Sequence, residues 1–82
     1  MNSSVLAAIA RFPDRGHAIV GLARKDEDFL ALCVDLADAA AALERWERSE
    51  SPLQEARCAE YRDLVRDLTA ELEATLDRRS PE

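Results

Sequence analysis

The sequence has few of the residues from which metal, nucleotide and catalytic sites are built. Its 82 residues include one histidine, two cysteines and two glycines. A zinc site needs several Cys or His ligands at short spacings, and a phosphate-binding loop needs clustered glycines followed by Lys and Ser or Thr. General acid–base catalysis needs two carboxylates that converge in a pocket, so many acidic residues do not by themselves indicate an active site. We therefore expect no cofactor, no metal site and no enzymatic activity, and we expect His17 to lie on the surface.

Long hydrophobic runs are also missing. The two longest, residues 5–10 and 29–34, have six residues each, whereas a membrane-spanning helix needs about 20. The first run lacks both the basic flank and the length of a secretory signal. The sequence thus predicts no membrane partner and a cytoplasmic location.

Aromatic residues are scarce, at 5% of the chain, although apolar residues together reach 48% because alanine is abundant. This composition is typical of a helical hairpin or bundle. A chain this short buries proportionally little surface, so it usually needs a disulfide, a metal or a second subunit for stability.

The negative charge is unevenly distributed along the chain. The net charge is -6, but Arg11, Arg15, Arg24 and Lys25 against Asp14 give the first 25 residues a charge of +3 and leave -9 for the remainder. An acidic body repels phosphate groups. We therefore expect no nucleic-acid partner, and we expect the basic segment to pair with the acidic one.

Two long amphipathic segments occupy residues 29–76. In the first, the larger apolar side chains recur at steps of 3 and 4, and they are Phe29, Leu32, Leu36, Ala39, Leu43 and Trp46. These steps match the a and d positions of a coiled coil, and Cys33 and Ala40 widen the stripe to the width that a bundle needs. The second segment is expected to direct inward Leu53, Tyr61, Leu64, Val65, Leu68, Leu72 and Leu76. One partner helix is too narrow to cover a stripe this broad.

Capping signals predict where the long helices begin and end. Three acidic residues, 26–28, favour a helix start near Asp26 because negative charge stabilises the positive end of the helix dipole. Ser51, Pro52 and Gln54 match a capping box, which predicts a second helix from Pro52 to about Arg78. A connection this short forces the two helices to lie antiparallel.

Two short helices are expected before residue 26. Ser3 or Ser4 is expected to cap the first, Pro13 to end it, and Asp14 to cap the second. Their apolar sides contain Val5, Leu6, Ile9, Phe12, Ile19, Val20 and Leu22. This segment is apolar enough to dock on another surface but too weak to fold alone.

The antiparallel arrangement also predicts a register, in which facing residues have numbers that sum to about 101. Phe29 then meets Leu72, and Tyr61 lies against the alanines at 39–42. Cys33 and Cys58 would be on the order of 13 Å apart along the helices. Because a disulfide requires Cα atoms within about 7 Å, both cysteines are expected to be free thiols.

Several of these positions resemble a known family. The positions concerned are Phe12-Pro13-Asp14, Ile19, Leu22, Asp26, Phe29, Leu32, the run Leu43-Glu44-Arg45-Trp46-Glu47, and Leu68, Glu71, Leu72 and Leu76. At these positions the chain resembles the YdcH-like proteins, which are small bacterial helical proteins of undefined function. The resemblance spans about residues 11–76. It implies a helical hairpin that self-associates, with no established activity.

Together these observations predict an all-α protein: an antiparallel two-helix hairpin with a short helical N-terminal arm, associating into a four-helix bundle. The expected divisions are an arm (residues 1–25), a hairpin (26–79) and a frayed tail (80–82). The predicted interaction surface consists of Phe12, Ile19, Leu22, Phe29, Leu32, Leu36, Leu43, Trp46, Tyr61, Leu68 and Leu72. The indole of Trp46 has two interpretations, a cap on the core or an anchor for a partner.

The function that this architecture favours is a non-enzymatic protein-interaction module that forms a homodimer through its apolar stripe. The alternative is a small acidic chaperone or adaptor that binds an amphipathic segment of a client protein. The stripe can be covered by the arm, by a second copy or by a client, and the sequence leaves these three occupants open.

Overall fold

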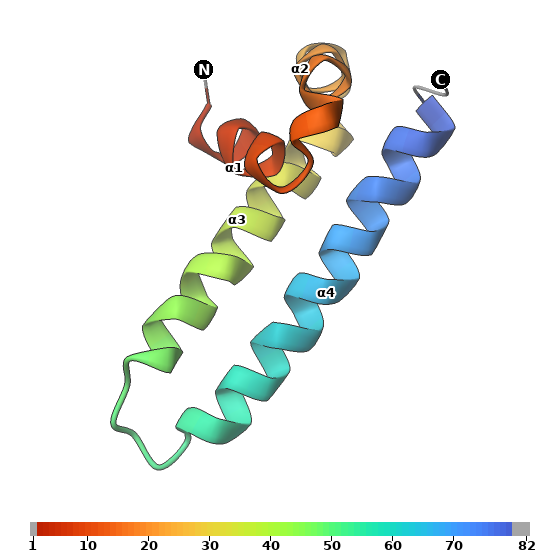
Figure 1. Cartoon of the computed structure of the whole chain (residues 1–82). Helices are drawn as coiled ribbons and strands as arrows, with labels where there is room; N and C mark the ends of the chain where they lie inside the picture. Colours follow the sequence, from red (N-terminus) through yellow and green to blue (C-terminus); the bar gives the residue numbers. More distant parts are fainter. Residues whose placement is uncertain (1, 80–82) are drawn as a thin grey trace.

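The computed structural model describes residues 2–79, so the predicted frayed tail lies outside the described residues. Within that range all regular structure is helical, in the order α1 (Ser3–Arg11), the 3-10 turn η1 (Pro13–Arg15), α2 (Gly16–Lys25), α3 (Glu27–Glu47) and α4 (Gln54–Arg79). The predicted all-α class is therefore confirmed. Figure 1 shows α3 and α4 side by side, running in opposite directions, with α1 and α2 gathered at one end.

The first two helices begin differently from the prediction. Asn2, not Ser3 or Ser4, caps α1, because its side-chain oxygen accepts a 2.6 Å hydrogen bond from the backbone N–H of Ser4. Asp14 lies inside η1, and α2 begins without a side-chain cap. The predicted end of α1 before Pro13 is confirmed, since its last residue is Arg11.

Helix α3 starts where its acidic cluster predicts. One carboxylate oxygen of Asp26 accepts hydrogen bonds from the backbone N–H groups of Asp28 (3.0 Å) and Phe29 (3.1 Å). These bonds satisfy two of the donors that a helix N-terminus leaves without intrahelical partners. The Asp26 side chain thus fixes the point at which the chain turns from α2 into α3.

The connection between α3 and α4 differs in detail from a capping box. The Ser51 hydroxyl accepts from the Leu53 N–H, but the Ser51 N–H donates to Ser49 Oγ instead of to Gln54. The Gln54 side chain instead donates to the carbonyl of Glu47, at the end of α3, with a 2.8 Å bond. Gln54 therefore ties the two helix ends together, and α4 begins there instead of at Pro52.

The core lies at the end of the molecule that holds α1 and α2. Its buried cluster consists of Val5, Ala8, Ile19, Leu22, Phe29, Cys33, Leu36, Leu72 and Leu76. Helix α1 packs on α3, and α2 packs on both α3 and α4. The N-terminal segment thus covers part of the apolar stripe of its own chain.

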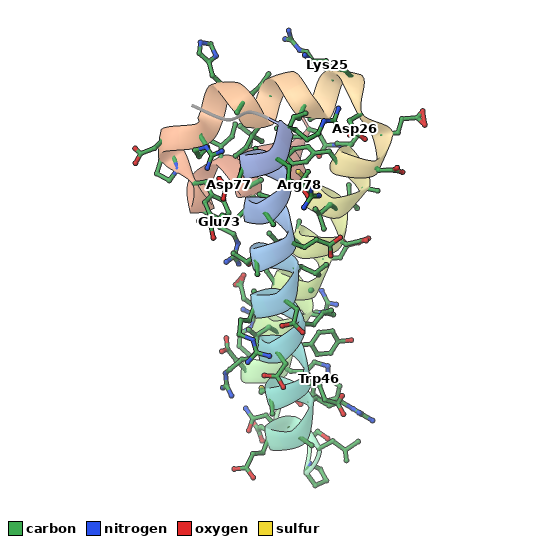
Figure 2. The ribbon with its side chains drawn as sticks, turned by 90° about the vertical axis from the view of Figure 1, so that its right-hand side faces the viewer. Lys25, Asp26, Trp46, Glu73, Asp77 and Arg78 are labelled. Atoms are coloured by element: carbon green, nitrogen blue, oxygen red, sulfur yellow. The ribbon has the colours of Figure 1, made fainter. Side chains whose placement is uncertain are left out.

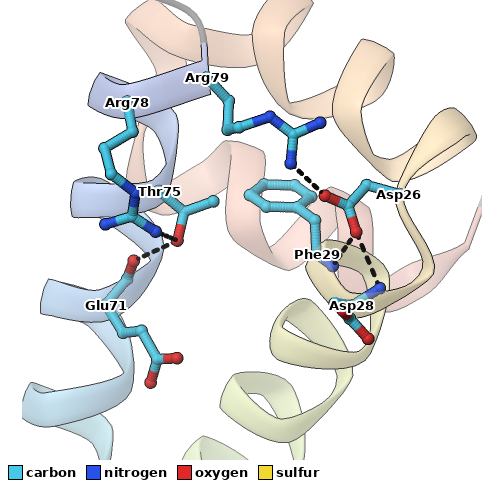
Figure 3. Close-up of polar contacts among 7 residues, drawn as sticks. All are labelled: Asp26, Asp28, Phe29, Glu71, Thr75, Arg78 and Arg79. Atoms are coloured by element: carbon cyan, nitrogen blue, oxygen red, sulfur yellow. Dashed lines mark hydrogen bonds and ion pairs between the residues drawn. The ribbon is translucent and has the colours of Figure 1, made fainter.

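Two ion pairs attach the end of α4 to this core. Asp77 accepts from Arg15 at 3.0 Å, and Arg79 pairs with Asp26. Figure 3 shows Arg79 reaching over Phe29 to the carboxylate that also caps α3. A basic residue of the N-terminal segment therefore does pair with the acidic part of the chain, at Asp77.

Three leucines that the periodicity directed inward are exposed. Leu6 of α1 is 53% exposed, Leu53 in the turn is 51% exposed and Leu64 of α4 is 43% exposed. In α1, Ala8 is buried in place of Leu6. For Leu64 the reason is the position of α1 and α2, which cover the far end of the α3–α4 pair and leave its middle uncovered (Figure 2).

Candidate interaction surface

The distal stalk, defined as residues 37–66, is the part of the structure that has almost no core of its own. Figure 2 shows it projecting from beneath the α1–α2 end. Its buried residues are Ala39, Ala42 and Cys58, all of them small. Two helices held together by such small side chains bury little apolar area, so packing stabilises this region weakly.

One face of the α3–α4 pair carries an open groove of about 620 Å³. We call it the alanine groove, and its lining residues are Asp35, Asp38, Ala39, Ala41, Ala42, Arg45, Tyr61, Leu64 and Leu68. Tyr61 therefore lies beside Ala39 and Ala42, where the predicted register puts it. The α3 side repeats at steps of 3, 4 and 3 through 35, 38, 42 and 45, and the α4 side at steps of 3 and 4 through 61, 64 and 68.

Charge is separated along the alanine groove. Asp35 and Asp38 lie toward the α1–α2 end, and Arg45 lies toward the turn. Within residues 2–79 none of these three side chains takes part in an ion pair. The groove thus has an acidic end, an apolar middle of alanine, and a basic end.

A second, smaller groove of about 370 Å³ has a different lining, to which α1 contributes. It is lined by Arg11, Leu43, Arg62, Val65, Arg66, Thr69, Ala70 and Glu73. Arg66 already pairs with Asp63 and Asp67 of its own helix. Arg11, Arg62 and Arg66 against Glu73 give this groove a net positive charge, so two copies of it placed face to face would bring like charges together.

The predicted interaction residues fall into two groups. Ile19, Leu22, Phe29, Leu36 and Leu72 are buried in the core of the chain itself, so their side chains are occupied by internal packing. Phe12, Leu32, Leu43, Trp46, Tyr61 and Leu68 are half-buried, and of these Leu43, Trp46 and Tyr61 belong to the distal stalk. The surface available to a partner is therefore smaller than the predicted stripe and is displaced toward the turn.

Sequence reasoning missed the polar ends of the groove. Asp38 and Arg45 lie seven residues apart and so share one face of α3. Apolar periodicity does not reveal them, because both residues are charged. The prediction that Leu64 points inward is wrong, since its side chain is 43% exposed. A search for charged residues that flank an alanine run at heptad spacing would have found this face.

In the described part of the chain the two cysteines and the histidine lie on three different helices. Cys33 and Cys58 are both free and buried, as the register predicts, and burial raises the pKa of the Cys33 thiol. His17 is exposed on α2. Among residues 2–79 no three His, Cys, Asp or Glu side chains are grouped to hold a metal ion, and no helix there has the length and apolarity to cross a membrane.

Comparisons of the chain with family models, with curated proteins and with solved structures give no match.

Proposed function

We propose that this protein is a non-enzymatic interaction module that forms a homodimer through the distal stalk. The observation that carries the proposal is the contrast between the two halves of the α3–α4 pair. The half beneath α1 and α2 has a core of leucine, isoleucine and phenylalanine, whereas the distal half buries two alanines and a cysteine. Apolar side chains in the distal half are left for a second chain to cover.

Two such stalks packed face to face form a four-helix bundle, which is the assembly that the breadth of the apolar stripe predicts. Leu64 and Tyr61 then become interior residues of the bundle, together with the alanines of α3. Burial of this apolar surface on association stabilises both the dimer and the stalk itself. The second copy thus takes the place of the core that the distal stalk lacks.

Size-exclusion chromatography with light scattering tests the proposal directly. At tens of micromolar we expect a mass of twice the chain's 9.1 kDa, and a melting temperature that rises with protein concentration. A particle of 9.1 kDa that melts cooperatively at the same temperature over a hundredfold range of concentration would rule out self-association.

The second candidate function is a small adaptor that holds an amphipathic helix of a client in the alanine groove. The groove favours this candidate because it is open, has an apolar middle and carries opposite charges at its two ends. An amphipathic helix presents apolar residues at i, i+3, i+4 and i+7, which match the 3 and 4 steps of the lining. On this model the homodimer is the resting state and the client displaces one copy.

Crosslinking in lysate distinguishes the adaptor from a simple dimer. The adaptor model predicts a specific crosslinked client with the wild type and its loss with Leu64→Glu, while Leu6→Glu, at an exposed leucine of similar accessibility on α1, retains it. If the wild type crosslinks only to itself, the adaptor model is wrong and the homodimer model is unaffected.

The proposal also covers the family, the cellular location and the catalytic status of the protein. We assign it to the YdcH-like group on the strength of the positions shared over residues 11–76. A cytoplasmic location is supported by the two free cysteines, since reduced thiols are typical of that compartment. We also propose that it has no catalytic role, because neither groove lining combines a nucleophile with a histidine base.

A further inference from the structure

From the charges of the alanine groove we infer the orientation of the homodimer: the two stalks pack antiparallel, with α3 against α3 and Asp38 of each copy facing Arg45 of the other. This inference rests on the proposed self-association and adds to it the docking face, the symmetry and the paired residues. It follows from the order of side chains along one helix.

The spacing of the charges makes the groove self-complementary under a two-fold axis. Asp38 and Arg45 both line it and are seven residues apart on α3, about 10 Å along the helix. A two-fold axis perpendicular to the stalk, passing midway between them, brings each Asp38 level with an Arg45. Two symmetric ion pairs result, because in an isologous interface every contact occurs twice.

The residues at the midpoint permit the close approach that these pairs require. Ala41 and Ala42 lie on either side of the position midway between Asp38 and Arg45, and both line the groove. Helix axes approach to about 8 Å when small side chains meet and remain farther apart when large ones do. Tyr61 of α4 lines the groove beside these alanines and covers the same centre from the second helix.

The opposite orientation is disfavoured by the same residues. A two-fold axis along the stalk lays α3 of one copy over α4 of the other. Asp35 and Asp38 then face Leu64 and Leu68, which lie at that level in the predicted register, and Arg45 remains about 10 Å from the nearest Asp38 along the stalk. Burial of a carboxylate against leucine without a cationic partner is costly.

Cysteine crosslinking of the full chain tests the orientation independently of the mass. In the antiparallel dimer Ala41→Cys lies next to its own symmetry mate, within the roughly 7 Å between Cα atoms that a disulfide needs. Leu53→Cys, in the turn, is roughly 20 Å from its mate along the stalk because the two turns lie at opposite ends. Under mild oxidation we expect a covalent dimer for the variant at position 41 and none for the variant at position 53. The wild type, whose two cysteines are buried, is the control and should stay uncrosslinked.

The possible results separate the orientation of the dimer, its docking face and self-association itself. Crosslinking at 53 but not at 41 would overturn the antiparallel orientation and leave self-association intact. A dimeric mass with crosslinking at neither position would overturn the alanine groove as the docking face. A monomeric mass for the wild type would remove the proposed function and the orientation together.

Charge reversal supplies a second test that does not depend on oxidation. Asp38→Arg and Arg45→Glu should each raise the dimer Kd at least about tenfold, because each places two like-charged pairs in the interface. The double variant restores both pairs and should return the Kd to within about threefold of the wild type. Glu44→Arg makes the same change of charge on the same helix, at a residue outside the groove lining, and should leave the Kd unchanged. Single reversals that behave like this control would overturn the proposed pairing.

Discussion

Leu64 offers the most informative single substitution, because its side chain is the large apolar group that the groove leaves open. Full burial of a leucine side chain contributes about 1.5–3 kcal/mol, and Leu64 keeps 43% of its surface exposed in the single chain. Covering that fraction in a dimer contributes roughly 0.6–1.3 kcal/mol per copy, and twice as much per symmetric dimer. Loss of the whole contribution would raise the Kd about 7- to 70-fold. Because alanine keeps the Cβ atom, we expect Leu64→Ala to raise it about tenfold.

Sedimentation velocity over a dilution series measures this change. The matched control is Leu6→Ala, since Leu6 is 53% exposed but lies on α1, outside the alanine groove. We expect Leu6→Ala to leave the Kd unchanged. Helical content from circular dichroism, measured at a concentration where both variants are monomeric, should match the wild type and so separates weakened association from unfolding.

Two results would contradict this role of Leu64 in the dimer contact. If Leu64→Ala leaves the Kd within twofold of the wild type, the alanine groove is not the contact surface. If Leu6→Ala raises the Kd as much as Leu64→Ala, association depends on general surface hydrophobicity and not on this face.

Three further predictions concern the fold itself. Leu76→Ala should lower the free energy of unfolding by about 2–5 kcal/mol, because this side chain is fully buried in the core beneath α1 and α2. Urea titration at fixed protein concentration measures this loss. A loss below about 1 kcal/mol would contradict that packing. The pKa of Asp26 is held below its ordinary 3.8, chiefly by the Phe29 N–H and then by Arg79, so its stabilising effect is complete above that pH and is lost as the pH falls through the lowered pKa. The urea midpoint of Asp26→Asn should therefore fall less between about pH 6 and about pH 2 than that of the wild type, and equal falls would count against the role of this carboxylate. Burial raises the pKa of the Cys33 thiol, so iodoacetamide should modify Cys33 far more slowly in the native than in the urea-unfolded protein. Mass spectrometry measures both rates of modification. Comparable rates would mean that this part of the core opens readily.

Local signals in the sequence predicted the positions of the helices but not all of the hydrogen bonds that cap them. Pro13 and Asp26 mark an end and a start that the structure reproduces. Gln54 was identified as a capping residue, but its side chain bonds to the carbonyl of Glu47 across the turn instead of to Ser51. The Ser51 N–H donates to Ser49 Oγ.

The candidate site could be predicted only in part. The periodicity predicted the apolar stripe, and the register predicted the position of Tyr61 among the alanines. The same periodicity predicted that Leu36 and Leu64 both point inward. In the structure Leu36 is buried in the core of the chain, whereas Leu64 is exposed in the groove. The spacing alone cannot separate them, since both belong to the apolar stripe of an amphipathic helix.

Residue patterns along the chain were enough to predict that this protein is helical, where its helices begin and end to within a few residues, and that its cysteines do not pair. These properties depend on local propensity, on caps and on helix length. The fold of the whole chain was needed to show that α1 and α2 pack back onto their own α3 and α4. That packing depends on long-range burial of Ile19 and Leu22 with Leu72 and Leu76, to which exposed ion pairs such as Arg15 with Asp77 add little. Because those contacts hold α1 and α2 at one end, the core is complete there and the alanine groove remains open toward the other.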